Sequence, residues 1–265
     1  MATTRRLPND LGLTTAAARV IFSPDDDSAG RVEMAVRRLS EAIRLGLLLD
    51  GERLPTEATL AEQMGVATVT LREALAVLRE QGMIETRRGR RGGNFVTSPR
   101  NQAAGLYARL KEFSTEALRD LGDHRSAVAG MAAKLAATRS VDGELDGLSQ
   151  RLERFRQAGT VSELRRADAE FSLAIAAAAQ SPRLAVQELR LRAEIGDLLW
   201  LDLNEGAQQH AWSLRATMLE AIRRRDPASA SELAERSVAF DTRRLVELRL
   251  QGYRLAPVQG AGVKA

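Results

Sequence analysis

The sequence predicts a mainly α-helical protein, with a small N-terminal domain of mixed helices and strands followed by a C-terminal all-α antiparallel helical bundle. Two observations predict this fold class. Between residues 50 and 97 the expected elements are short and of both types, whereas from residue 106 to 253 apolar residues recur at helical spacing with brief Gly, Ser, Asn or Pro breaks. A chain of 265 residues, 44% hydrophobic and 28% charged, is long enough for two such domains.

Composition excludes several kinds of chemistry. The chain has no Cys, so disulfides, cysteine-ligated zinc and cysteine nucleophiles are excluded. Its two histidines, His124 and His210, are too few for a metal cage of three histidines. No apolar run is long enough to span a membrane, and Arg5 and Arg6 are not followed by the apolar core of a secretory signal. We therefore expect a cytoplasmic protein that does not bind membranes.

The N-terminal domain is expected over residues 31–97, after a mobile arm at residues 1–30. Its first element is an amphipathic helix that begins near Arg31. Thr56 is placed to cap a second helix over residues 57–64, Gly65 ends that helix, and a third runs over about residues 67–81. Two helices joined at a Gly predict a helix-turn-helix. The strand-like pieces MIET and NFVT then flank RRGRRGG, which predicts a hairpin with a cationic tip.

Residues 98–105 are interpreted as a linker, residues 106–253 as the helical domain and residues 254–265 as a tail. Breaks in the apolar pattern divide the helical domain into seven expected helices. They lie near residues 106–122, 124–138, 143–157, 161–180, 182–202, 207–225 and 227–253.

An ordered set of residues over about 45 positions resembles the winged helix-turn-helix of the GntR family of bacterial transcription regulators. The set comprises Leu54-Pro55, Glu57, Leu60-Ala61, Gly65-Val66, Leu71-Arg72-Glu73-Ala74-Leu75, Leu78, Gly82 and a Gly-rich wing ending in Phe95-Val96. The resemblance implies sequence-specific binding to double-stranded DNA. Three positions differ from the common family pattern. Ala58 and Thr68 stand where the family often has Arg, and Ala67 stands where it commonly has Ser or Thr. We therefore expect fewer base contacts than usual, and either an operator that differs from the common family sites or a larger share of the affinity from the wing.

A recognition helix enters the major groove by its first turns, which carry Thr68, Thr70 and Arg72 outside the apolar stripe. Val69 lies opposite that stripe, where it is placed to touch a thymine methyl group. In the wing, Arg87, Arg88, Gly89, Arg90 and Arg91 are expected to bind phosphates.

The C-terminal part resembles the FCD-type effector domain of FadR-like regulators, in the segments HRSAVAGMAAKLAATRS, RADAEFSLAIAAAAQSPRL and MLEAIRRRDPASASELAERSV. Such domains hold a small carboxylate or acyl ligand, often beside a metal bound by one Asp and three His. Carried over by position, those ligands fall on Asp168, Ser172, Arg215 and Ser237, of which only Asp168 remains a metal ligand. We therefore expect no metal and no cofactor, and we interpret His124 and His210 as surface or capping residues.

The best candidates to bind an effector carboxylate are Arg125 and Arg215, because a cation buried in a bundle needs an anion. Asp168, Ser172 and Ser237 complete the expected effector site, although Asp168 is alternatively an exposed residue paired with Arg165 or Arg166. The sequence thus predicts a homodimeric, metabolite-sensing transcription regulator on a near-palindromic operator. Two alternatives remain open. One is a DNA-binding protein that needs no ligand, and the other is a helical enzyme using Asp168 and Glu170, which point to different faces of their helix.

Overall fold

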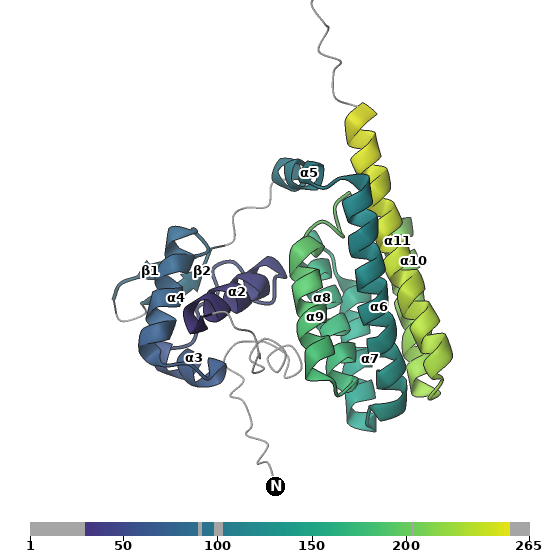
Figure 1. Ribbon diagram of the computed structural model, residues 1–265, viewed down its shortest axis with the longest axis horizontal. Coiled ribbons are helices and arrows are strands. Elements are labelled where there is room, and N and C mark those ends of the chain that lie inside the picture. Colours follow the sequence, from purple (N-terminus) through teal and green to yellow (C-terminus); the bar gives the residue numbers. More distant parts are fainter. Residues whose placement is uncertain (1–29, 90–91, 98–102, 203, 255–265) are drawn as a thin grey trace, which may run out of the picture.

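The computed structural model describes residues 30–89, 92–97, 103–202 and 204–254. Figure 1 shows a small N-terminal domain beside a larger bundle of helices. The elements are α2 (Arg31–Arg44), α3 (Glu57–Met64), α4 (Thr68–Glu80), β1 (Ile84–Arg87), β2 (Gly93–Val96), α5 (Ala103–Glu112), α6 (Thr115–Arg139), α7 (Asp142–Gln157), α8 (Val161–Ala178), α9 (Pro182–Ile195), α10 (Glu205–Arg223) and α11 (Pro227–Arg254). Most of the expected arm, linker and tail lies outside the described residues, although Gly30 is described and Arg254 ends α11.

The small domain is a winged helix-turn-helix. The Thr56 side chain accepts a hydrogen bond from the Thr59 amide at 3.3 Å and so caps α3, while Gly65 ends that helix with a φ of 67°, a left-handed conformation that suits glycine. Strands β1 and β2 pair antiparallel, from Ile84 opposite Val96 to Arg87 opposite Gly93. The predicted helix-turn-helix and hairpin are confirmed.

The expected helix break at residue 123 is wrong. The break lies instead at residues 113–114, where Ser114 caps α6 by accepting the Ala117 amide at 3.0 Å. Helix α6 then runs unbroken through Gly122, which acts as a packing residue because a Cβ there would come within 2.6 Å of the Thr242 hydroxyl on α11. Helix α5 begins at Ala103, within the segment expected to be linker.

The large domain is a helical bundle in which α6 and α11 pack along each other (Figure 1). Helix α8 packs against α6, α7 and α9, and α10 packs against α6, α7 and α11. Phe155 and Trp200 are fully buried and meet edge to face with ring centroids 5.3 Å apart. The predicted fold class is confirmed. Among the described residues, no helix is both long enough and apolar enough to cross a membrane.

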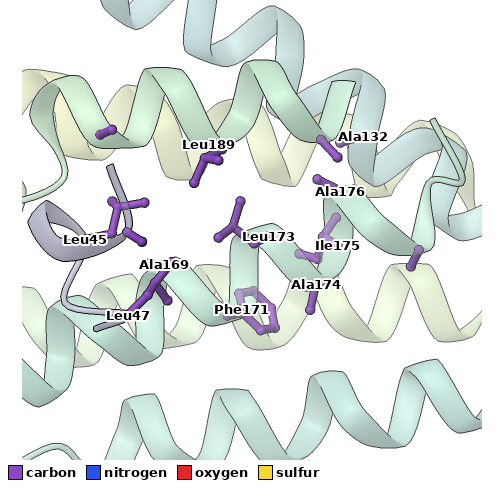
Figure 2. Packing of buried hydrophobic residues seen from close by; sticks show 14 of the residues in the cluster. Leu45, Leu47, Ala132, Ala169, Phe171, Leu173, Ala174, Ile175, Ala176 and Leu189 are labelled. Carbon is purple, nitrogen blue, oxygen red and sulfur yellow. The ribbon is translucent and has the colours of Figure 1, made fainter. Parts of the chain in front are cut away.

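The two domains share part of their apolar core. Leu45 and Leu47, in the loop after α2, are buried in the same cluster as residues of α8 and α9. Figure 2 shows them entering that cluster with Ala169 of α8 and Leu189 of α9. A Leu45 methyl group also lies against Gly196, where a Cβ would come within 2.9 Å of it. The winged domain is therefore packed against the helical bundle by buried apolar contact.

Candidate functional site

The first turn of α4 presents an exposed surface suited to DNA. Val69 is 63% exposed, although it is apolar, and Thr68 and Thr70 beside it are partly exposed. The N-cap position is Ala67, which provides no side-chain hydrogen bond to the helix. The first backbone N–H groups of α4 therefore have no side-chain cap, and such groups bind phosphate well.

Arg72 is held in place on this surface by an ion pair with α3. Its Nε donates to Glu57 Oε2 at 2.7 Å, while the Arg72 side chain remains 65% exposed. This contact uses one edge of the guanidinium. The terminal nitrogens remain the part that could reach a phosphate or a base edge.

In the wing, Arg87 is held by two neighbours. Its guanidinium lies 4.3 Å from the centre of the Phe95 ring, and its Nε donates to Glu85 Oε1 at 2.7 Å. Arg88 and Gly89 are exposed at the end of β1, and Gly89 has a φ of 108°. Arg90 and Arg91, predicted to bind phosphates, lie outside the described residues.

Two hollows border the small domain. One of about 470 Å³ lies between α2 and α9, and one of about 600 Å³ lies between α3 and the wing and is lined by Arg53 and Arg79. Arg79 Nη1 donates to the Thr86 hydroxyl at 3.2 Å, which in turn donates to Asn94 Oδ1 at 2.7 Å. This chain of bonds ties α4 to the wing. Sequence reasoning missed Arg53 and Arg79 as cations near the expected DNA surface, because they lie in a strand-like segment and at the far end of α4.

In the helical domain, Asp168 is buried and bound by two arginines. Arg215 Nε donates to Asp168 Oδ1 at 2.9 Å, and Arg192 Nη1 donates to Asp168 Oδ2 at 2.5 Å. Burial alone would raise the pKa of Asp168, but the attraction of Arg192 and then of Arg215 outweighs it and holds that pKa below its ordinary value. The alternative of an exposed Asp168 is wrong, since only 1% of the residue is exposed.

Arg215 lies at the centre of this group. Its guanidinium carbon is 5.1 Å from the centre of the Phe155 ring and 5.3 Å from that of Trp200. Its Nη2 is 3.6 Å from Asp241 Oδ2, which also accepts a hydrogen bond from Arg125 Nη2 at 3.3 Å. Burial lowers the pKa of Arg125, and Asp241 acts against that shift.

These charges border a cavity inside the bundle. Its volume is about 30 Å³, room for roughly two water molecules. Ser172, Arg215 and Ser237, three of the predicted effector residues, all line it. Asp168 and Arg125 are not in its wall but are bonded to Arg215 and Asp241, which are. The structure thus brings the five predicted effector residues into one neighbourhood.

Sequence reasoning missed Glu188, Arg192 and Asp241, which also line this cavity. Arg192 Nε donates to Glu188 Oε1 at 2.6 Å, one turn away on α9. A signal was present for each residue. Asp241 continues the buried stripe of Ala234 and Val238 on α11, and Glu188 and Arg192 fall among the buried positions of α9. A charged side chain in an apolar stripe needs a buried partner, so these positions were identifiable.

The residues at the expected metal position do not fit a divalent metal ion. Ser172 and Ser237 provide hydroxyl groups, which are weak ligands, and Arg215 holds a permanent cation against Asp168. Within the described residues, no group of three His, Asp or Glu side chains is placed to hold a metal. His124 and His210 are both exposed, and the His210 ring lies tilted against that of Phe240 with ring centroids 4.8 Å apart.

The carboxylate pair considered for an enzyme is not assembled. Glu170 lies two residues after Asp168. Its Oε1 accepts a hydrogen bond from Arg166 Nε at 3.0 Å, and its Oε2 lies 3.0 Å from Arg154 Nη1. Asp168 faces Arg192 and Arg215 instead. The two carboxylates therefore occupy different ion-pair groups, as the two-residue spacing predicts.

Comparison with known proteins agrees with this geometry. Residues 31–93 match the model of the bacterial regulatory proteins of the gntR family, and residues 120–240 match that of the FCD domain. A protein of Mycobacterium gastri named as an HTH-type transcriptional regulator, RmpR, is 36% identical over 224 residues, which cover 83% of this chain and 82% of the relative. The Nta operon transcriptional regulator of Aminobacter aminovorans is 30% identical over 193 residues, covering 72% and 84% of the two chains.

Among solved structures, McbR/YncC of E. coli is similar in fold, with a TM-score of 0.50, 20% identity, and coverage of 85% of this chain and 99% of that one. The predicted family and function are confirmed: the protein is a DNA-binding transcriptional regulator with a helical domain that responds to a metabolite. The chain belongs to the GntR family of bacterial regulatory proteins and carries an FCD domain as its helical part.

Proposed function

We propose that this regulator binds a near-palindromic operator as a homodimer in the cytoplasm, and that a small carboxylate-bearing effector in the bundle cavity changes its affinity for DNA. The observation that carries this proposal is the coexistence of an exposed cationic surface in the winged domain with buried, paired arginines beside a cavity in the helical domain. Arginine in these two settings suits two different anions, a phosphate backbone and a small ligand.

On the DNA side, Thr68, Thr70, Val69 and Arg72 are proposed to read bases in the major groove. Arg87, Arg88, Arg90 and Arg91, with Gly89 allowing close approach, are proposed to bind phosphates. The ion pair between Arg72 and Glu57 supports this division, because it orients the guanidinium before DNA arrives. A pre-oriented side chain loses less entropy on binding than a free one.

Helix α9 is proposed to carry the signal between the two sites. Arg192 on this helix binds Asp168 at the cavity. Arg190, Ala193 and Glu194 of the same helix line a groove shared with α2 of the winged domain. A ligand that displaces Arg192 would therefore shift an element on which the winged domain rests. Couplings of this kind are typically worth about 1 to 3 kcal/mol.

Dimerisation is assigned to the helical domain, residues 104–265, because seven helices can bury a core of their own and still present a helix face. Sedimentation of the full chain and of this fragment should give dimers. A monomeric fragment with a dimeric full chain would move the dimer contact to the winged domain.

The test of DNA reading is a binding assay with operator variants selected from a random library. Val69→Ala and Thr70→Ala should change the ranking of operator variants, whereas Arg88→Ala should weaken all of them alike. An unchanged ranking in both α4 variants would contradict the assignment.

Enzymatic turnover is not part of this proposal, since the candidate carboxylates Asp168 and Glu170 lie in separate ion-pair groups.

We also propose that sensing needs no metal ion. Elemental analysis of protein purified without chelator should find less than one equivalent of bound transition metal per chain. One equivalent of tightly bound zinc, nickel or manganese would contradict this part of the proposal.

A further inference from the structure

Six ionisable side chains form one buried group in the helical domain. Each residue is at most 6% exposed, and together they come from five helices, α6 and α8 to α11. They are Arg125, Asp168, Glu188, Arg192, Arg215 and Asp241. Three guanidinium groups face three carboxylates, so the formal charge of the group is zero. Half-buried Arg244 lies nearby, but it also faces Asp202 and Glu247 and donates to the carbonyls of Leu199 and Leu201.

This balance restricts which ligand can enter. A buried charge without a partner is strongly unfavourable, because desolvation is not offset by attraction. A simple carboxylate would leave the group with an excess negative charge, and a simple amine would leave it with an excess positive charge. A ligand of zero net charge would keep the balance.

Two atoms of the group are also left with unused hydrogen-bonding capacity. Arg125 Nη1 is a buried donor and Asp241 Oδ1 a buried acceptor, and neither has a hydrogen-bond partner among the described residues. The two side chains are joined by the bond from Arg125 Nη2 to Asp241 Oδ2 at 3.3 Å, and Asp241 lines the cavity. The unused acceptor of Asp241 is therefore at the cavity wall, where Arg192 and Arg215 supply cations, and a ligand that meets both must offer a donor and an anionic acceptor close together.

Apart from the hydroxyl groups of Ser172 and Ser237, the rest of the cavity wall is apolar and made of small or unbranched and aliphatic side chains. Ile175, Met218 and Val238 line it together with Ala129, Ala132 and Ala234. Since the cavity holds only about 30 Å³, a ligand larger than roughly two waters must move part of this wall. A short aliphatic group matches the wall in polarity and requires the least movement.

We propose that the effector is a small zwitterion, an α-amino acid with a short aliphatic side chain, whose carboxylate pairs with the arginines and whose ammonium group pairs with Asp241. This inference rests on the proposed sensing function and narrows its ligand class. An α-amino acid places an anionic acceptor and a cationic donor on one carbon atom, which suits a wall where the cations of Arg192 and Arg215 lie near the unused oxygen of Asp241. It also adds no net charge to the buried group.

The first experiment uses the full chain and matched probes. Calorimetric titration with L-valine is compared with isovalerate, which lacks the ammonium group, and isobutylamine, which lacks the carboxylate; alanine, 2-aminobutyrate and leucine extend the series. At least one amino acid should bind, and at least tenfold more tightly than its two truncated analogues. Equal or tighter binding of the carboxylate analogues would overturn the zwitterion while leaving a carboxylate sensor intact. Binding of no amino acid in the series would overturn it as well.

The second experiment changes the charge of the group. Asp241→Asn is nearly isosteric and leaves an excess positive charge, so it should shift preference at least tenfold toward isovalerate relative to valine. Glu188→Gln should shift it in the same direction and serves if the first variant fails to fold. Glu170→Gln is the matched control, because Glu170 is equally buried but pairs with Arg154 and Arg166. An unchanged preference in folded Asp241→Asn and Glu188→Gln would overturn the proposal.

A final readout separates this proposal from the sensing function. Operator affinity is measured with each probe at saturation. A change caused by isovalerate but not by valine would keep the sensor and reject the zwitterion. Operator affinity that stays constant although valine binds would keep the ligand class and count against the proposed regulation.

Discussion

The winged domain and the helical domain use arginine in opposite ways. In the winged domain the side chains of Arg72 and Arg87 are 65% and 54% exposed, and each has one carboxylate partner that is also partly exposed. In the helical domain the side chains of Arg125 and Arg215 are 3% and 2% exposed and face buried carboxylates. Water screens the first pair of contacts and leaves those cations available to phosphates. The second pair lies where every charge must be matched.

The largest effect is expected from removing a buried arginine. Arg215→Ala leaves Asp168 and Asp241 with one cation fewer, and the free energy of unfolding should fall by about 3 to 5 kcal/mol. The matched control is Arg224→Ala, at the C-cap of the same helix. Arg224 is 72% exposed and pairs with Glu220 one turn away, so its loss should cost less than about 1 kcal/mol. Urea unfolding followed by circular dichroism measures the free energy of unfolding of both variants. Similar losses in the two would contradict the contrast between buried and exposed arginines.

The buried group should also respond to acid. Because Arg192 and Arg215 hold the pKa of Asp168 below its unfolded value of about 3.9, its ionised form stabilises the folded state above that pH. The stabilisation is lost as pH falls through the folded-state pKa. The stability difference between the native protein and Asp168→Asn should therefore stay constant from about pH 8 to 5 and shrink below about pH 4. A difference that grows on acidification would contradict this sign.

For the exposed arginines, the expected effect is on DNA and not on stability. Arg87→Ala should weaken operator and random DNA similarly, and the slope of log affinity against log salt should lose about 0.9. Fluorescence anisotropy at several salt concentrations measures this slope, with Arg224→Ala as the control that should leave it unchanged. If Arg87→Ala weakened only the operator, Arg87 would be a base-reading residue.

The smallest effect is expected at the contact between the two domains. Glu41 on α2 is buried near Arg190 of α9, and burial raises its pKa although Arg37 and Arg190 act against the shift. Its charged form is therefore less stable in the folded state, and this cost is present above the folded-state pKa. Glu41→Gln should raise the free energy of unfolding at pH 7 by less than about 1 kcal/mol, and the gain should vanish below about pH 4. A loss of stability at pH 7 would show that the surrounding arginines outweigh burial.

The predictability of the two regions differs for a physical reason. The winged domain is built from local signals, such as the Thr56 cap and the turn at Gly65, so helix bounds of the helix-turn-helix and the hairpin were predicted within a few residues. In the bundle, local signals misled at Gly122. A glycine inside a helix reads as a break from sequence, but here it allows α11 to approach α6 at Thr242. No local sequence pattern predicts the contact between Gly122 and Thr242.

The candidate effector site shows the same division. Arg125, Asp168 and Arg215 were predicted because charged residues at these positions matched a known pattern or required an anion. Their partners Glu188, Arg192 and Asp241 were not, since α9 meets α8, and α11 meets α6 and α10, only through the packing of the bundle. Each of these three residues was visible as a charge in an apolar stripe, but the stripe does not say which helix supplies the opposite charge.

By itself, the sequence determined the class of fold and the order of the domains, because helix caps, turns and amphipathic spacing act over a few residues. Only the tertiary structure decided how the charges of the helical domain combine. It placed Arg215 against Asp168, where a metal would otherwise be expected, and paired Arg125 with Asp241 across 116 positions of the chain. Ion pairs of such separation depend on the packing of whole helices, since burial removes the water that would otherwise solvate each charge alone.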